Sequence, residues 1–508
     1  MNKNDVYLMG IDIGTTGVKT LLINQEGEVI SSITTEYPMF TPKPNWAEQN
    51  PEDWYKSTIE TIKRTLHKTK INPEKIKGIG LTGQMHGLVL LDKNHSVLRP
   101  CILWCDQRTD KQCEYITNKI GKERLIQLVC NPALTGFTAG KILWVRDNEP
   151  QIYEKIYKIL LPKDYIRFRL TGEFATDVSD ASGTLLLDIK NRRWSDEILN
   201  ELDIKKDFLP VCYESIEITG KITRYISKLT GLIEGTPVIA GGGDQAAQAV
   251  GTGIVKIGDV SATIGTSGVV FAFTDEVKLD PLGRVHTFCH AVPGKWHIMG
   301  VMLSAGGSLR WFRDNFCNQE KDEAKRTKKD VYDIILRNCS NISAGSDGLI
   351  FLPYLTGERT PHSDPYARGV FFGLSLLHTK DHIARSILEG VTYGMKDSLE
   401  IIKEMNVPVN QIRLSGGGAK SLLWRQIQSD IYNRTVVTVN ITEGAAYGAA
   451  LLATVRTGIY GSVEQACKNT IKVTSSLNPD IKNVPVYEKY YRIYQSLYKS
   501  LKDEYRKL

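Results

Sequence analysis

A glycine-rich turn with an acid beside it stands near the start of the sequence. The segment MGIDIGTTGVKTLLIN, residues 9–24, carries Asp12 at the end of an apolar run and then the turn Gly-Thr-Thr-Gly at residues 14–17. The backbone N–H groups of such a turn, together with threonine hydroxyls, form a concave site that suits a phosphate group. One turn is weak evidence, because hairpins also use glycine for purely conformational reasons. The common phosphate-loop pattern GxxxxGK[ST] is absent, and no GxGxxG motif opens a helix.

The same turn recurs about half the chain later. IGTTGV at residues 13–18 returns as IGTSGV at residues 264–269, with strand-like residues on both sides of each copy. Two such turns on opposite walls of a cleft would grip one triphosphate. The preceding position is Asp12 in the first copy and Thr263 in the second. Since a triphosphate needs magnesium, which prefers carboxylate oxygen and water, Asp12 is the candidate metal ligand, and Lys19 would add positive charge.

A second acid follows a run of three glycines. In PVIAGGGDQAAQAVG, residues 237–251, a strand leads through the glycines to Asp244 and then into a helix of small residues. Asp244 stands where a helix N-cap would, and capping is a common role for Asp. The glycines also allow a ligand to approach closely, and a helix N-terminus favours the ionised carboxylate that a base must have. The motif leaves two interpretations open: a cap, or the general base of a phosphoryl transfer.

A third glycine-rich turn is SGGGAKS at residues 415–421, between an expected strand and an expected helix. Its glycines would let a flat group such as adenosine lie against the backbone. Close packing of the strand on the helix is the alternative explanation.

The elements that position these turns alternate between strands and helices. Apolar periodicity predicts strands at residues 6–12, 18–24, 75–83 and 411–418 and helices at residues 50–68, 382–405 and 421–433. Asn50 is expected to cap the first helix. The alternation indicates an α/β architecture. The repeated turn predicts two similar halves that face each other across a cleft: residues 1–251, with the first phosphate turn, and residues 252–508, with the second.

Composition excludes several classes of protein. The net charge is +7 over 508 residues, and 42% of the residues are hydrophobic, as in ordinary globular proteins. The main basic cluster, KDEAKRTKKD at residues 321–330, contains acids and is expected to face solvent, so nucleic acid is not an expected partner. No apolar run approaches the ~18 residues of a membrane span. With no signal-peptide pattern and nine scattered cysteines, a cytoplasmic protein with reduced thiols and no membrane partner is expected.

The ordered motifs of the chain resemble those of the FGGY carbohydrate kinases. The matching segments run nearly end to end and include GIDIGTTGVK, WAEQNPEDW, GLTGQMHG, LRPCILWCDQR, GFTAGKILWV, GGGDQAAQAVG, IGTSGVVFA, FLPYLTGERTPH and LSGGGAKS. The resemblance implies two actin-like, ribonuclease H-like ATPase domains flanking a catalytic cleft, with the sugar site in residues 1–251 and the nucleotide site in residues 252–508. It also implies a small sugar and ATP as partners, with Mg²⁺ as cofactor, and it leaves open whether the chain forms a homodimer.

The resemblance also implies roles for individual residues. Asp244 matches the catalytic base, and Asp12 matches the acid associated with magnesium. The expected ATP-binding residues are Thr15, Thr16, Lys19, Gly265, Thr266, Gly306, Arg310, Gly417 and Gly418. The expected sugar-binding residues are Met85, His86, Trp104, Asp106, Asp244 and Gln245.

The expected reaction is ATP-dependent phosphorylation of D-xylulose to D-xylulose 5-phosphate. Met85 and His86 match the family members that act on xylulose, whereas related glycerol kinases carry Arg-Glu there. Gln245 departs from the pattern of these family members, which often have Asn directly after the catalytic Asp. Gln has the same hydrogen-bonding groups on a longer side chain. The departure leaves open which pentulose is preferred. Two alternatives stay open: a kinase for another ketose or polyol, such as ribulose or glycerol, and a nucleotide-switched binding protein on an actin-like scaffold.

Overall fold

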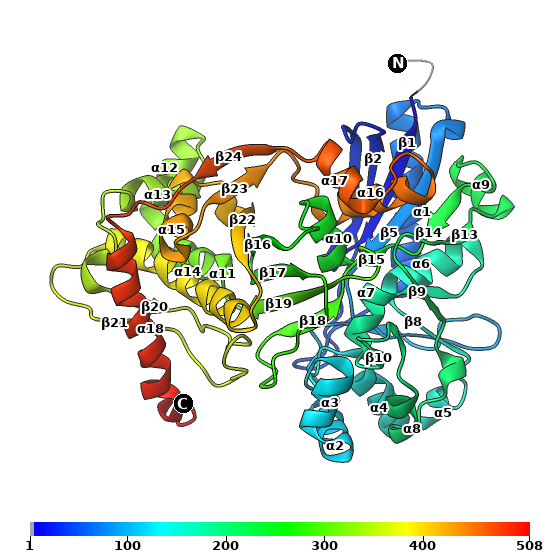
Figure 1. The fold of residues 1–508 in the computed structure, drawn as a ribbon, viewed down its shortest axis with the longest axis horizontal. Coiled ribbons are helices and arrows are strands. Elements are labelled where there is room, and N and C mark those ends of the chain that lie inside the picture. The colour runs from blue at the N-terminus through cyan, green and yellow to red at the C-terminus, as the bar shows by residue number, and fades with distance from the viewer. Residues whose placement is uncertain (1–4) are drawn as a thin grey trace.

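Two seven-stranded sheets form the frame of the molecule (Figure 1). A computed structural model describes residues 5–508. The first sheet contains β1 (Tyr7–Ile13), β2 (Gly17–Asn24), β3 (Val29–Glu36), β5 (Ile76–Gly83), β13 (Ile218–Lys221), β14 (Pro237–Ile239) and β15 (Gly242–Gly243). The second contains β16 (Gly258–Ile264), β17 (Gly268–Thr274), β18 (His286–Cys289), β19 (Trp296–Met302), β22 (Val409–Gly416), β23 (Val436–Val439) and β24 (Val473–Leu477).

The two sheets share one pattern of connections. In the first, β1 is antiparallel to β2 and parallel to β5, and β2 is antiparallel to β3. In the second, β16 is antiparallel to β17 and parallel to β22, and β17 is antiparallel to β19. Asp12 pairs with Thr82 on β5, and Thr263 pairs with Ser415 on β22. The two glycine-rich turns therefore occupy equivalent corners, and the predicted α/β fold of two similar halves is confirmed.

The helices of the first half pack beside the sheet and below it (Figure 1). Helix α1 (Pro51–Thr69) begins as predicted, because the side chain of Asn50 accepts a hydrogen bond from the Glu52 N–H. A helical layer contains α2 (Asp110–Ile120), α3 (Lys122–Val129), α4 (Thr138–Asn148), α7 (Val178–Ala181) and α8 (Asp196–Glu201), and its core also includes side chains of β18 and β19. Helix α6 (Pro162–Thr171) packs against β5 and α1.

One long helix, α14 (Lys380–Glu404), is central to the second half. The helices gathered around it are α11 (Gly306–Phe316), α12 (Asn318–Thr327), α13 (Val331–Cys339), α15 (Leu422–Tyr432) and α18 (Val484–Tyr505). Five tyrosines of α18 are buried in the same core as α14, so this face of the helix packs on the protein body. No helix within residues 5–508 is both long enough and apolar enough to cross a membrane.

Two helices join the halves. Helix α10 (Asp244–Gly251) packs on α16 (Gly444–Arg456), and α16 also lies against β1 and β5 (Figure 1). One core cluster combines side chains of both sheets with residues of α10 and α16. A helix from the end of the sequence therefore completes the first half. The division into residues 1–251 and 252–508 stays a prediction, and the packing of α16 shows that the two parts share a core.

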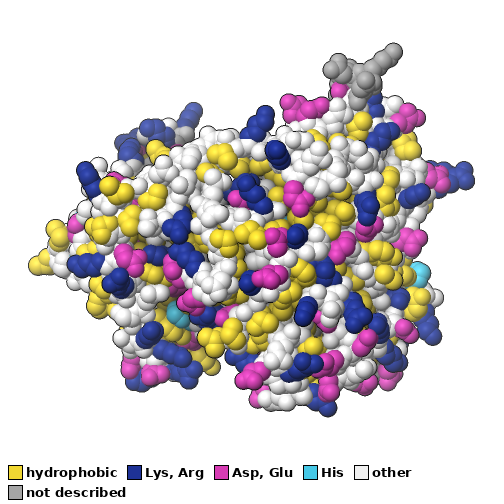
Figure 2. Space-filling model, viewed as in Figure 1, with side chains coloured by type: hydrophobic (Ala, Val, Ile, Leu, Met, Phe, Trp, Pro, Cys, Tyr) yellow, Lys and Arg dark blue, Asp and Glu magenta, His cyan; other side chains and the backbone are white. Residues whose placement is uncertain are grey.

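Charged side chains of both signs are mixed over the face that Figure 2 shows. Most residues of α12, which belongs to the mixed-charge segment at 321–330, are solvent-exposed or half-buried, as expected.

Candidate active site

Asp244 is the first residue of α10 and directly follows β15. The N-cap of this helix is Gly243, so the sequence-based placement of Asp244 at the cap is wrong by one residue. The backbone N–H and the side-chain amide of Gln245 lie next to the Asp244 carboxylate and interact with it.

Burial and the nearby negative charge of Asp12 together raise the pKa of Asp244 to about 7. The interactions with Gln245 act in the opposite direction. The expectation that the helix N-terminus keeps Asp244 ionised is thus outweighed by desolvation of the carboxylate. A carboxyl group with a pKa near neutrality is suited to accept a proton at physiological pH.

Asp12 lies at the end of β1 and carries a buried oxygen, Oδ1, without a hydrogen-bond partner in the described part of the chain. Burial raises the pKa of Asp12 to about 6, and the charge of Lys19 opposes this shift. Within residues 5–508, no cluster of three His, Cys, Asp or Glu side chains could hold a metal ion alone. The Asp12 carboxylate fits Mg²⁺ bound through a single protein ligand, because this ion usually takes its other ligands from water and substrate phosphates.

The first glycine-rich turn is fixed by its neighbours. The Thr15 hydroxyl donates to Gln84 Oε1 over 3.3 Å and accepts from the Trp104 indole N–H over 3.0 Å. Thr16, next in the turn, has an exposed side chain. Lys19 Nζ lies 3.1 Å from a carboxylate oxygen of Glu443, just before α16. Lys19 is therefore part of an ion pair between the two halves of the sequence.

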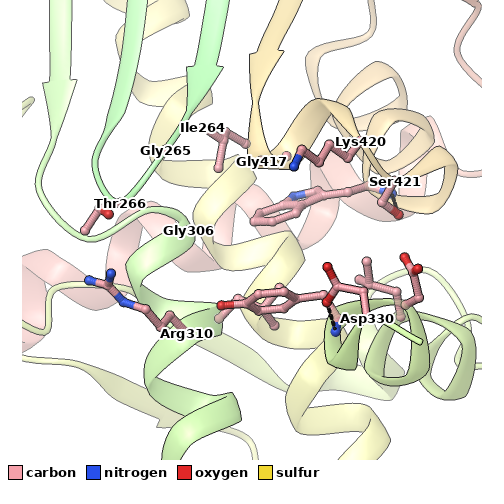
Figure 3. A pocket seen from close by; sticks show the side chains of 15 residues that line it. Ile264, Gly265, Thr266, Gly306, Arg310, Asp330, Gly417, Lys420 and Ser421 are labelled. Atoms are coloured by element: carbon pink, nitrogen blue, oxygen red, sulfur yellow. Dashed lines mark hydrogen bonds between the residues drawn. The ribbon is translucent and has the colours of Figure 1, made fainter. Parts of the chain in front are cut away.

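The second glycine-rich turn forms one wall of a cavity of about 310 Å³ (Figure 3). Six of the residues expected to bind ATP line it: Gly265, Thr266, Gly306, Arg310, Gly417 and Gly418. Figure 3 shows Thr266 and Arg310 at one end of the cavity, and Asp330 and Ser421 at the other. Gly306 N donates to Gly265 O over 2.8 Å, and a Cβ on Gly306 would overlap that same oxygen. Glycine is thus required where α11 meets the turn.

Sequence reasoning missed several residues of this cavity, namely Leu309, Asp330, Tyr332, Asp333, Leu336, Lys420, Ser421 and Trp424. Asp330 is the last residue of the segment that was expected only to face solvent. Its side chain caps α13 by accepting from the Tyr332 N–H over 2.8 Å. An Asp immediately before an apolar periodic segment is an N-cap signal, so the helix could have been predicted, but not its position beside the glycine turns.

His86 lies in a turn and has the left-handed backbone angle φ 68°. Its Nδ1 is 2.6 Å from the Gly183 carbonyl oxygen. Because a carbonyl can only accept, Nδ1 carries the proton and Nε2 is left as an acceptor. Burial lowers the pKa of His86 to about 3, and the charges of Lys141 and Arg359 contribute, so the ring is neutral. Lys141 Nζ donates to the His86 carbonyl over 2.8 Å and fixes the turn.

A second cavity, of about 40 Å³, contains His86 and Trp104. Its other lining residues are Leu134, Gly136, Phe137, His286, Phe288, Met299 and Arg359, none of which the sequence pointed to. Phe137 meets the His86 ring edge-on, with ring centroids 5.1 Å apart. Four of the lining residues come from the second half of the chain. The sequence-based assignment gave sugar binding to residues 1–251 alone, whereas this cavity is lined by both parts.

Met85 and Asp106 lie outside the lining of this cavity. Met85 is buried against the turn before Asp244, since a Cβ on Gly243 would lie 2.9 Å from the Met85 sulfur. Asp106 is fully buried, and its carboxylate accepts from Arg108 and from the Ala47 N–H, each over 2.6 Å. Met85 therefore joins the His86 turn to the Asp244 turn, while Asp106 is already engaged within the protein.

A buried charge cluster supports the glycines before Asp244. Lys163 Nζ lies within ion-pair distance of Asp164, Asp177 and Asp180, and all four side chains are fully buried. Asp177 accepts a hydrogen bond from the Ser179 hydroxyl, which itself accepts from Gly243 N over 3.1 Å. The cluster thus fixes the backbone that leads into Asp244.

The paired sheets, the cavity beside the glycine turns and the buried carboxylates define a phosphotransferase with an actin-like ATPase fold. The chain belongs to the FGGY family of carbohydrate kinases: the family's N-terminal domain matches residues 7–251, and its C-terminal domain matches residues 260–457. It is a sugar kinase, and its substrates are a sugar and ATP.

Individual relatives cover the chain almost completely. The xylulose kinase of Bacillus subtilis is 40% identical over 98% of this chain and 97% of its own length. The gluconokinase of the same organism is 34% identical over 99% of this chain and 97% of its own length. The crystal structure of ligand-bound xylulose kinase from Lactobacillus acidophilus is 28% identical, with a TM-score of 0.91 over 99% of both chains.

Proposed function

We propose that this sugar kinase transfers the γ-phosphoryl group of ATP to D-xylulose and forms D-xylulose 5-phosphate. The observation that carries the proposal is the contact of Met85 with Gly243, because it sets the Met85–His86 turn directly against the residue before Asp244. A sugar held at His86 would then reach the Asp244 carboxylate. The names of the relatives with 37–40% identity, which are xylulose kinases, support the choice of sugar.

In this proposal, His86 and the apolar walls hold the sugar chain. His86 Nε2 accepts a hydrogen bond from a sugar hydroxyl, and Phe137 and Phe288 pack against the carbon chain. Asp244 accepts the proton of the terminal hydroxyl. The hydroxyl oxygen forms a bond to the γ-phosphorus, the bond to the β,γ-bridging oxygen breaks, and ADP leaves.

The nucleotide would lie in the cavity of the second half. Its phosphates would point to the end with Thr266 and Arg310, and adenosine would lie against Gly417 and Gly418. Thr15 and Thr16 would contribute from the first turn. Asp12 would hold Mg²⁺, directly or through water, and the ion would spread the negative charge of the phosphates. The dependence on ATP supports a cytoplasmic location.

Other acceptors are the main alternative. The similarity to a gluconokinase favours a sugar acid as the second candidate substrate, ahead of ribulose and glycerol. A coupled assay of ADP release across D-xylulose, D-ribulose, L-ribulose, D-gluconate and glycerol tests the proposal. D-xylulose should give the highest kcat/KM. A higher value for any other member of the panel would contradict the assignment of the sugar, and Gln245 would be the first residue to re-examine.

A further inference from the structure

Arg359 brings a positive charge without a protein partner into the His86 cavity. Its guanidinium makes no hydrogen bond or ion pair with any residue from 5 to 508. The residue is nevertheless half-buried. Every other arginine that lacks a side-chain partner in this range is exposed: Arg193, Arg224, Arg310, Arg326 and Arg506.

The neighbouring acid does not neutralise this charge. One oxygen of Glu358 accepts from Leu303 N over 3.0 Å and from the backbone N–H of Arg359 over 2.7 Å. Burial raises the pKa of Glu358 to about 8, so this carboxyl is mainly protonated at neutral pH. His86 and His286, which line the same cavity, have lowered pKa values and are neutral. The cavity therefore carries a net positive charge at Arg359.

The backbone around Arg359 is firmly attached to the second sheet. Thr360 N donates to Val301 O over 3.0 Å, and Val301 N donates to the Thr360 hydroxyl over 3.1 Å. Val301 belongs to β19, which is paired on both sides within that sheet. Arg359 is thus presented by a rigid element of the second half, opposite His86 of the first half.

We propose that Arg359 binds a carbonyl or carboxylate oxygen at the end of the sugar chain remote from the phosphorylated hydroxyl. A guanidinium has only donors, so it needs an acceptor, and a charge withdrawn in part from water without one is unfavourable. The cavity of about 40 Å³ has room for one end of a sugar, since a single water needs about 10–15 Å³. His86 Nε2 takes a hydroxyl, and Arg359 takes the oxygen that has no proton.

This inference rests on the proposed sugar kinase function and defines its substrate class. Ketoses and sugar acids offer a carbonyl or carboxylate oxygen that only accepts hydrogen bonds. A polyol offers a hydroxyl at the same place. The proton of this hydroxyl would need a further acceptor, in a cavity that carries the positive charge of Arg359. Arg359 therefore favours ketoses and sugar acids over the corresponding polyols.

The test compares three five-carbon acceptors that differ at one end: D-xylulose, xylitol and D-xylonate. Steady-state kcat and KM are measured for the wild-type chain, for Arg359→Gln and for the matched control Arg368→Gln. Arg368 is exposed and donates only to the carbonyls of Pro365 and Ala367. Sugar-independent ATP hydrolysis and the KM for ATP report whether the fold and the nucleotide site are intact.

Arg359→Gln should lower kcat/KM for D-xylulose about 10- to 100-fold, mainly through KM, because it removes a charged hydrogen bond. The value for xylitol and the KM for ATP should change less than about threefold, and the Arg368 control should behave like the wild type. A comparable loss for D-xylonate would show that the carboxylate is bound as well; a loss for D-xylulose alone would restrict the contact to a carbonyl.

Equal losses for D-xylulose and xylitol, or no loss for either, would overturn the inference. Failure of the proposed function gives a different result: the wild type would not turn over D-xylulose but would accept another sugar. The inference then stands if that sugar carries a carbonyl or carboxylate oxygen and its kcat/KM falls in Arg359→Gln. It is overturned if that sugar is a polyol.

Discussion

At the scale of single residues, the cavity proposed to bind the sugar offers a hydrogen-bond acceptor on one side and a donor on the other. His86 is neutral, with Nδ1 tied to Gly183 O, so only Nε2 can meet a ligand, and only as an acceptor. The Arg359 guanidinium can only donate. The carboxyl groups of Asp244 and Asp12, both with raised pKa values, are proposed to act where the phosphoryl group is transferred.

His86→Ala should raise the KM for D-xylulose about tenfold, because a buried sugar hydroxyl would lose its acceptor. The KM for ATP should stay near the wild-type value, since His86 does not line the nucleotide cavity. His95→Ala is the matched control: His95 also has a positive φ, of 65°, but it is exposed. Equal effects of both substitutions would show that backbone strain, and not sugar binding, explains the result.

The rate should also report the ionisation of Asp244. Its pKa is raised to about 7, so the carboxyl becomes protonated as the pH falls through this value and can no longer accept a proton. The kcat/KM for the sugar should therefore decrease below about pH 7 and level off above it. A profile of ADP release against pH measures this. A constant rate from about pH 5 to 8 would argue against Asp244 as the base.

At the scale of elements, the buried cluster around Lys163 supports the approach to α10. Lys163→Met should destabilise the protein by about 3–5 kcal/mol, because three buried aspartates would lose their shared cation. Denaturant unfolding measures this change. Lys190→Met, at an exposed lysine, is the control and should stay within about 0.5 kcal/mol of the wild type. Similar unfolding curves for both variants would contradict a supporting role of the cluster.

The elements themselves could largely be predicted from the sequence. The strands expected at residues 6–12 and 18–24 are observed at Tyr7–Ile13 and Gly17–Asn24. This agreement is expected, because the hydrophobic pattern of a strand and the residues of a turn depend on neighbouring positions in the sequence. The cap of α10 was misplaced by one residue, since capping depends on backbone angles that a motif does not fix. Tyr332 and Arg359 were missed because only tertiary packing brings their segments to the cavities.

At the scale of the whole molecule, α10 and α16 connect the two halves through close backbone contact. A Cβ on Gly448 would overlap the Ala247 carbonyl oxygen, so no larger residue fits between the helices. Gly448→Ala should lower the free energy of unfolding by about 1–3 kcal/mol or more, as overpacking does. Gly461→Ala is the control, because its Cβ would meet only the flexible end of Gln465, at 3.1 Å. If both variants unfold alike, the helix contact does not limit stability.

Both halves also line the cavity proposed for the sugar, whereas the cavity proposed for the nucleotide is lined by the second half. The central claim is that Asp244, at the start of α10, is the base that accepts the proton of the sugar hydroxyl when this hydroxyl attacks ATP. Sugar should therefore stimulate ATP turnover only when this carboxylate is present.

The most direct test is ADP release with D-xylulose, ATP and Mg²⁺ for the wild type and for Asp244→Asn, with ATP affinity measured separately. The Asn variant keeps the size of the side chain and leaves the Gly243 cap of α10 unchanged. D-xylulose should strongly stimulate the wild type, and turnover should fall about 10²–10⁴-fold in the variant while ATP still binds. Full sugar-stimulated activity of Asp244→Asn would contradict the account.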